Sequence, residues 1–288
     1  MLHYIITRFN LRLWTHDKTG GIIDQTTWLD KRLDLFERYC LPSVSSQTNN
    51  NFVWFLLFDS ETPVKYKKRV KGYQKTCPQI KLIAVNPSYS KRFVDIIQDV
   101  VRDFAREYLK THQGEETIIT TYLDNDDALR NDFVERVQET ALSVPPKTFI
   151  SFVKGIQYFT QLNIATRIRY QNNHFISLTE SLKDLGNVMT VYGYSSHFYI
   201  DKVNGCNRKY IDSNAMWVEV VHEKNVDNDV KMTFHTKLIK KADELNPFGR
   251  HFTINRHSRR IYITKFAWRW VKQMIRRGKD KLFGRKDI

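Results

Sequence analysis

One stretch decides the fold, and it reads Ile118-Ile119-Thr120-Thr121-Tyr122-Leu123-Asp124-Asn125-Asp126-Asp127. Its apolar and β-branched residues 118–123 predict a buried strand. Carboxylates then follow at the strand end where open α/β sheets bind their ligands. Three like charges so close repel one another, so we expect a cation there. Mg²⁺ or Mn²⁺ meets this need while also holding a diphosphate, because both ions prefer oxygen ligands. The alternative is a solvated turn in which Asp126 or Asp127 caps the next helix.

Strands and helices alternate on the N-terminal side of this stretch. Apolar runs predict strands over 3–7, 52–58 and 80–85, and helical spacing predicts helices over 28–44, 63–76 and 94–109. Such alternation is typical of an α/β fold with a mostly parallel sheet flanked by helices. Asp59 follows its strand as Asp124 follows 118–123, so both are expected at one edge of that sheet, facing one crevice.

The second half has a more mixed pattern. We expect residues 149–153 and 155–159 to pair as strands, and residues 164–178 to form strands joined by a turn at 171–173. Loop and strand are predicted for 187–194, and an apolar strand-like segment for 216–222. From Ile263 onward the apolar residues recur at helical spacing, which predicts an amphipathic helix with a basic face.

Composition indicates a globular protein with an anionic partner. The 288 residues are 41% hydrophobic and carry a net charge of +15. Residues 256–288 hold 12 Lys/Arg and 2 Asp, a net of +10, which leaves only +5 for the rest. The charge is therefore concentrated in a C-terminal tail.

Three separated cysteines show no zinc-binding or disulfide spacing, which is typical of a reduced, cytosolic protein. The N-terminus has no signal-peptide pattern, and no apolar stretch approaches the ~20 residues that cross a bilayer. We therefore expect a cytoplasmic protein that is neither exported by a standard signal nor integral to a membrane.

Three stretches together resemble the GT-A glycosyltransferases, in particular the inverting family-2-like group. They are the strand 3–7 with Arg8-Phe9-Asn10 at its end, the segment from Trp28 through Gln47-Thr48 and 52–58 to Asp59-Ser60-Glu61-Thr62-Pro63, and Tyr122 to Leu129 with its DxD-like turn. The closest match is the bacterial putative rhamnosyltransferase family, over roughly residues 1–140. The turn Asp59-Ser60-Glu61 departs from the two adjacent aspartates and glycine of the better-known family-2 pattern.

The resemblance implies roles for the carboxylates. Asp59 and Arg8 would hold the nucleoside of a sugar nucleotide. Asp126 would bind the metal directly, and Asp124 would bind ribose or a metal-bound water. Asp127 would contact sugar hydroxyls. The metal, Mn²⁺ or Mg²⁺, would stabilise charge on the leaving diphosphate.

The resemblance also places the catalytic base and a late metal ligand in the second half. An inverting transfer needs a carboxylate that accepts the acceptor hydroxyl's proton, and Asp212 and Glu219 are candidates beside Asp127. Glu219 interrupts an apolar segment, which a solvent-facing sheet edge would equally explain. His222 is the candidate histidine ligand, with a surface or core histidine as the alternative.

Arginines on the helix before the acidic turn are candidates for binding the diphosphate. Arg102 and Arg106 lie on that helix, and Arg92 precedes it. Guanidinium groups match phosphate oxygens well. A solvated helix face is the alternative explanation.

The expected function is metal-dependent sugar transfer from a nucleotide-sugar donor to a glycan or lipid-linked acceptor, inverting, in bacterial surface polysaccharide synthesis. Residues 1–255 would form the GT-A domain, with 1–140 as the nucleotide-sugar half and 141–255 as the acceptor half. The basic tail 256–288 would bind an anionic membrane surface on the cytoplasmic side, and no nucleic acid is expected.

Other functions remain open from the sequence. A basic, aromatic-rich tail also suits a nucleic-acid-binding module, and the alternative to membrane binding is a helix packed on the domain. The same carboxylates would serve a metal-dependent nuclease or phosphotransferase, and a non-catalytic relative is a further alternative.

Overall fold

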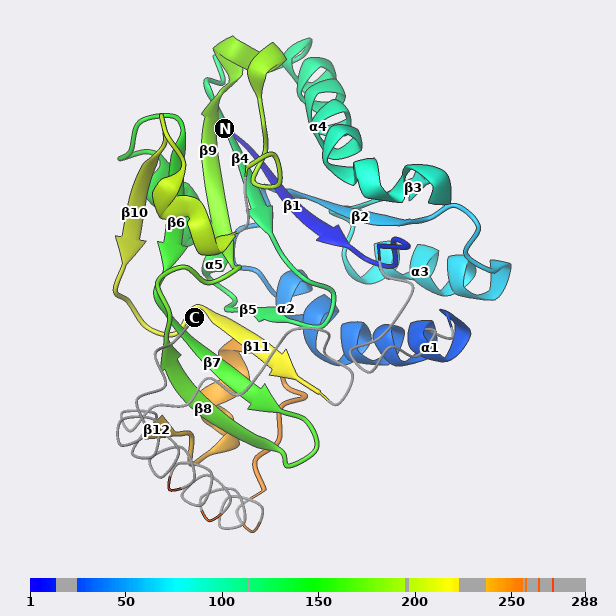
Figure 1. The fold of residues 1–288 in the computed structure, drawn as a ribbon, viewed down its shortest axis with the longest axis vertical. Coiled ribbons are helices and arrows are strands. Elements are labelled where there is room, and N and C mark those ends of the chain that lie inside the picture. Colours follow the sequence, from blue (N-terminus) through cyan, green and yellow to red (C-terminus); the bar gives the residue numbers. More distant parts are fainter. Residues whose placement is uncertain are drawn as a thin grey trace, which may run out of the picture.

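The structure, a computed structural model, describes residues 1–13, 25–112, 114–194, 197–222 and 237–255, with residues 257, 264 and 271 (Figure 1). The predicted basic amphipathic helix of the C-terminal tail therefore lies almost wholly outside the described residues. Within the described part, no helix has the length and apolarity to span a bilayer.

The central sheet of the described residues has seven strands. Their order is β10 (Asn207–Ile211), β6 (Thr148–Phe152), β9 (Ile176–Ser181), β4 (Thr117–Tyr122), β1 (Leu2–Arg8), β2 (Val53–Asp59) and β3 (Ile80–Val85). Only β9 runs antiparallel to its neighbours. The α/β class, the mostly parallel sheet and the four N-terminal strands are as the sequence predicts.

Helices cover both faces of this sheet because the central strands are apolar on both sides. On β1, Ile6 faces a cluster with α4 (Phe93–Leu109), while Ile5 faces the opposite cluster. That second cluster includes α1 (Gln25–Leu35), the π-helical turn Phe36–Cys40, α2 (Leu41–Ser45), α3 (Val64–Thr76) and α5 (Phe133–Ala141). Figure 1 shows α4 apart from α1 and α3, which lie across the sheet.

A second, five-stranded sheet carries the remaining described strands. Its order is β12 (Lys237–Leu238), β8 (Ile164–Arg169), β7 (Lys154–Phe159), β11 (Trp217–Val221) and β5 (Ala128–Leu129). It packs on the 3₁₀ segment Ala242–Phe248 through a small core of its own.

One predicted strand pairing is wrong. β6 and β7 exist but do not pair, because only Val153 separates them, which leaves no room for a turn. The chain instead passes from the central sheet into the second sheet. The strands predicted within 164–178 are present as β8 and the start of β9, and the chain between them returns to the central sheet. The strand predicted within 187–194 is absent from the described residues of that segment, where turns follow a 3₁₀ segment at 182–187.

Both halves of the sequence contribute to the central sheet, since β6, β9 and β10 extend the sheet that β1–β4 begin. The connection from β4 to β5 crosses from one sheet to the other. This crossing is the acidic turn 124–127, which therefore lies between the sheets.

Candidate active site between the two sheets

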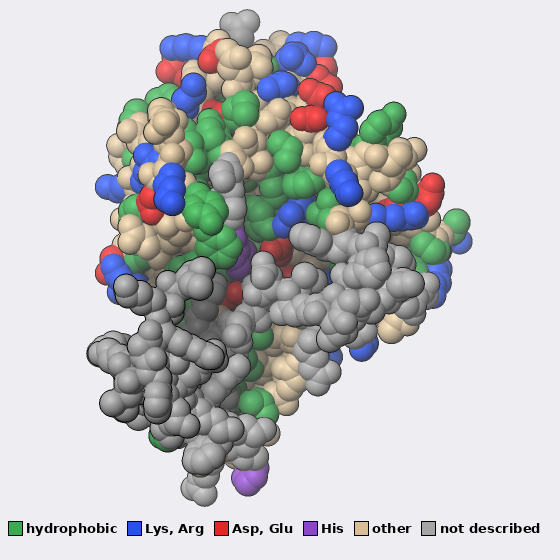
Figure 2. Space-filling view, viewed as in Figure 1, with side chains coloured by type: hydrophobic (Ala, Val, Ile, Leu, Met, Phe, Trp, Pro, Cys, Tyr) green, Lys and Arg blue, Asp and Glu red, His purple; other side chains and the backbone are tan. Residues whose placement is uncertain are grey.

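The acidic turn sits where the carboxyl end of β4 meets the carboxyl end of β11. β5 pairs antiparallel with the beginning of β11, at Trp217 and Val218, so the preceding turn runs alongside the strand's last residues. In the space-filling view, histidine and acidic side chains lie together in a depression of this face, and hydrophobic side chains form part of its rim (Figure 2). The topology thus presents the turn at a ligand-binding edge.

Asp126 is buried and contacts two cationic or titratable side chains. Its Oδ2 atom lies 2.6 Å from Nη1 of Arg32 and 2.9 Å from Nε2 of His222. Burial alone would raise the pKa of Asp126, but the Arg32 charge and the His222 hydrogen bond together hold it well below its usual range. Asp126 is therefore a carboxylate, and the predicted pair of Asp126 and His222 is in direct contact.

Asp127 joins the turn to both sheets. Its Oδ1 atom accepts the backbone N–H of Val220 at 2.8 Å, and its Oδ2 atom lies 2.8 Å from Nε2 of His174. Burial raises the pKa of Asp127 to about 7, and the neighbouring Asp126 charge adds to this. Burial opposes the charged form of His174, but the bond to Asp127 raises its pKa to about 9. The pair therefore holds a proton at neutral pH.

Asp124 faces the end of β1. The hydroxyl of Tyr122 donates to its carboxylate, and Nη2 of Arg8 lies 3.4 Å from Oδ1. Arg8 also contacts the Tyr122 hydroxyl, and its guanidinium lies 5.2–5.5 Å from the rings of Phe93, Tyr122 and Tyr192. These aromatic faces hold the cation at the edge of the sheet.

Asp59 lines a separate pocket at the end of β2. It accepts hydrogen bonds from Nε of Arg12 at 2.5 Å and from the backbone N–H of Glu61 at 2.7 Å. The remaining lining residues are Asn10, Leu29, Thr62, Pro63 and Tyr66, so the pocket has apolar and polar walls. Such a mixed lining suits a planar heterocycle with polar edges.

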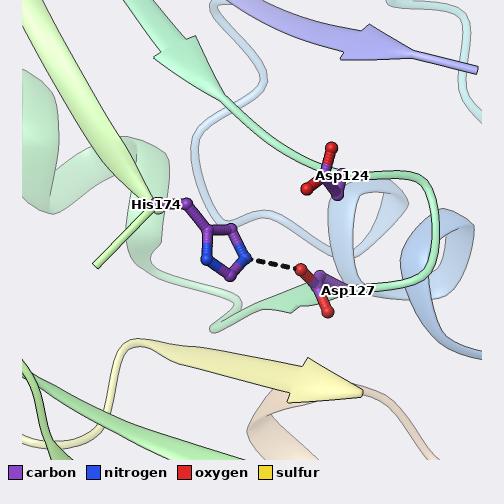
Figure 3. Close-up of side chains that lie close together, drawn as sticks. All are labelled: Asp124, Asp127 and His174. Atoms are coloured by element: carbon purple, nitrogen blue, oxygen red, sulfur yellow. Dashed lines mark hydrogen bonds and ion pairs between the residues drawn. The ribbon is translucent and has the colours of Figure 1, made fainter. Parts of the chain in front are cut away.

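The residues of the turn are suited to hold a divalent cation. One ligand atom from each of Asp124, Asp127 and His174 lies within 4.8 Å of the others (Figure 3). Asp126 and His222 form a second contact at the same turn, with Oδ2 of Asp126 2.9 Å from Nε2 of His222. Carboxylate oxygens with imidazole nitrogens form a donor set that fits Mn²⁺ and, through the oxygens, Mg²⁺.

Two predicted phosphate ligands lie elsewhere in the structure. Arg102 donates to the carbonyl oxygen of Val188 at 2.9 Å, and Arg106 pairs with Asp103 on the exposed face of α4. The reason is geometric, because α4 begins near the carboxyl edge of the sheet and runs back toward its amino edge. At ~1.5 Å per residue, its second half is far from the turn. Arg92 pairs with Asp95 on the surface.

The two second-half base candidates do not present an exposed carboxylate to the turn. Asp212 forms ion pairs with Lys154 and Arg169. Lys154 begins β7, which is parallel to β11, so this cluster lies at the end of the second sheet away from His222. Glu219 is 1% exposed and accepts from Nε2 of Gln157 at 2.7 Å, so it belongs to the protein interior and not to a solvent-facing edge.

Sequence reasoning missed two residues of the site, Arg32 and His174. Arg32 lies on the polar side of α1, and nothing in a helical pattern separates it from ordinary surface arginines. His174 directly follows the predicted turn 171–173. The sequence pattern therefore indicated only that it begins a strand, and gave no sign of a role in the site.

Comparison with protein families gives a match over residues 6–233 to the family described as putative rhamnosyl transferase. The chain belongs to this family of glycosyltransferases. The resemblance of the first half is thereby confirmed and extended into the second half. A search of the curated proteins gives no match.

Solved structures that are similar include other glycosyltransferases. S. aureus TarS residues 1–349 matches with 10% identity and a TM-score of 0.36, covering 76% of this chain and 60% of that one. The longer S. aureus TarS structure matches with 11% identity and a TM-score of 0.37, covering 77% of this chain and 37% of that one. Mouse xyloside xylosyltransferase 1 in its apo form matches with 12% identity and a TM-score of 0.25, covering 53% of this chain and 52% of that one. This chain therefore spans between 37% and 60% of the length of the chains it matches.

Proposed function

We propose that this protein is a metal-dependent, inverting glycosyltransferase that transfers a sugar from a nucleotide-sugar donor to a glycan or lipid-linked acceptor. The observation that carries the proposal is the convergence of Arg8, Asp59 and the turn Asp124–Asp127 at one sheet edge, with His222 against Asp126. A nucleoside pocket beside paired carboxylates is what a metal-bound nucleoside diphosphate requires.

Asp126, His222 and Asp124 are the residues that we propose to hold the ion, on the contact between Asp126 and His222. Asp124 also belongs to the group with Asp127 and His174, which is the alternative ligand set at the same turn. When bound, a divalent cation neutralises the charge that develops on the leaving diphosphate. Arg8 contributes a fixed positive charge at the same edge, and its aromatic neighbours limit its movement. Asp59 and the pocket around it orient the nucleoside.

Asp127 and His174 hold the turn in place through hydrogen bonds. Their bonds to β11 and to each other fix the turn between two sheets, so Asp124 and Asp126 are preorganised before a ligand arrives. The inverting course follows from the resemblance to family-2 enzymes, and the anomeric configuration of the product tests it.

The proposed acceptor belongs to surface polysaccharide synthesis at the cytoplasmic face of the membrane. Supporting this, the 33-residue tail 256–288 carries a net charge of +10, which an anionic leaflet would attract. Sedimentation with vesicles that contain anionic lipid, compared with purely zwitterionic vesicles, tests this part independently of the transfer reaction.

Donor hydrolysis tests the catalytic proposal without knowledge of the acceptor. A panel of UDP-, GDP-, dTDP- and CDP-sugars is incubated with Mn²⁺, and release of nucleoside diphosphate is measured. We expect release from one nucleotide class, abolished by chelation and by Asp126→Asn. Arg106→Ala is the matched control, and it should keep full activity because Arg106 pairs with Asp103 on the surface. Equal activity in chelator would contradict metal dependence.

A further inference from the structure

Arg32 contacts the acidic turn although it comes from a helix that no motif connects to it. Its Nη1 atom lies 2.6 Å from Oδ2 of Asp126 and 3.1 Å from Oδ1 of Asn125. The side chain is 13% exposed, and its guanidinium lies 5.2 Å from the ring centre of Trp28. Arg32 is thus held at the turn by two oxygens and one aromatic face.

The same oxygen of Asp126 is shared with His222, whose Nε2 lies 2.9 Å away. A divalent cation bound by Asp126 and His222 would need this oxygen. A guanidinium at 2.6 Å from the oxygen and an ion bound to it would also repel each other at short range. Arg32 and the metal therefore compete for Oδ2 of Asp126.

We propose that Arg32 occupies the metal-binding oxygen of Asp126 in the metal-free protein and moves to the donor's diphosphate when the ion binds. The inference rests on the proposed nucleotide-sugar site and adds a residue to it. The guanidinium is a planar fork that matches phosphate oxygens, and a metal-bound diphosphate would lie next to the carboxylate that Arg32 leaves. Within the described residues, no other arginine contacts Asp126.

Binding of the ion and of the diphosphate are then linked. The ion releases Arg32 for the phosphates, and the phosphates withdraw Arg32 from Asp126, so each ligand raises the affinity for the other. This arrangement also keeps Asp126 paired with a cation at all times, which a buried carboxylate needs.

Calorimetric titrations of wild type and Arg32→Gln test the proposal. With Mn²⁺ alone, we expect the variant to bind about tenfold more tightly, because a charge-assisted contact no longer competes for Asp126. With saturating Mn²⁺, we expect the preferred nucleoside diphosphate to bind about tenfold more weakly, because one phosphate contact is lost. A residue that only supports the fold would not tighten metal binding.

Arg69→Gln is the matched control, since it removes an arginine pair with Glu37 that does not involve the turn. It should leave both affinities unchanged. Arg32→Lys is the second variant if Arg32→Gln does not fold. A lysine carries a point charge and cannot form the two parallel hydrogen bonds of a guanidinium. We therefore expect this variant to bind Mn²⁺ with an affinity between those of wild type and Arg32→Gln, and to bind the diphosphate more weakly than wild type.

Two results would overturn the proposal in different ways. If wild type binds Mn²⁺ and a nucleoside diphosphate but the Arg32 variants bind Mn²⁺ no more tightly, competition by Arg32 is wrong while the proposed function stands. If wild type binds neither ligand, the proposed function fails, and the role of Arg32 fails with it.

Discussion

Replacing Asp127 by alanine should destabilise the fold through the junction of the two sheets. The substitution removes the acceptor of the Val220 N–H and of the His174 ring nitrogen, both of which lie at 2.8 Å and are buried. A buried donor without an acceptor costs about 1–3 kcal/mol, and two of them cost about 2–6. Removing the repulsion between Asp127 and its acidic neighbours offsets part of this loss. We therefore expect a net loss of about 3 kcal/mol.

Thermal unfolding followed by circular dichroism measures this effect. For a chain of 288 residues, about 3 kcal/mol corresponds to a decrease in Tm of about 5 °C. Asp127→Asn should lose only about 1 kcal/mol, because its carbonyl oxygen still accepts from Val220 and its amide can donate to a neutral imidazole. Asp103→Ala, on the exposed face of α4, is the control and should leave Tm unchanged. An Asp127→Ala protein that melts within about 1 °C of wild type would refute the reasoning.

The remaining predictions concern stability away from the turn. Arg69 lowers the pKa of Glu37 from its ordinary value of 4.5, so this pair stabilises the fold above pH 4.5 and the contribution disappears as pH falls below it. The free energy of unfolding of Glu37→Gln should thus be about 1 kcal/mol below that of wild type at pH 7, and the two should become equal in acid. Urea unfolding at both pH values measures this, and a difference that stays constant with pH would contradict it. Gly155→Ala should destabilise by about 3 kcal/mol or fail to fold, because a Cβ there would lie 2.2 Å from the Trp217 ring. Gly72→Ala on α3, with nothing within 4 Å, should instead raise stability by about 0.5–1 kcal/mol, as measured by the same melts.

The sequence predicts the N-terminal half well because local pattern and topology agree there. Apolar runs such as 52–58 predict strands without a competing interpretation. Their alternation with helices leaves few possible topologies for a parallel sheet. The carboxylates at two strand ends therefore had a predictable position. Asp126 and His222, two candidate metal ligands of the sequence, come into contact because β11 ends beside the turn.

The second half was harder because its strands divide between two sheets. A strand at 148–152 followed directly by one at 154–159 has the pattern of a pair, and only long-range packing sends them apart. Arg102 was misplaced for a related reason, since helical periodicity gives the face of a residue but not which end of the helix meets the site. Arg32 carries no local signal at all, because its role depends on a contact with a residue 94 positions away.

Nucleoside diphosphate binding tests the central claim most directly. Thermal-shift and calorimetric titrations with UDP, GDP, dTDP and CDP, with and without Mn²⁺, compare wild type with Asp126→Asn. The account predicts that one base binds selectively, that binding requires the ion, and that Asp126→Asn loses it while remaining folded. Absence of binding to all four diphosphates at any Mn²⁺ concentration would contradict the account.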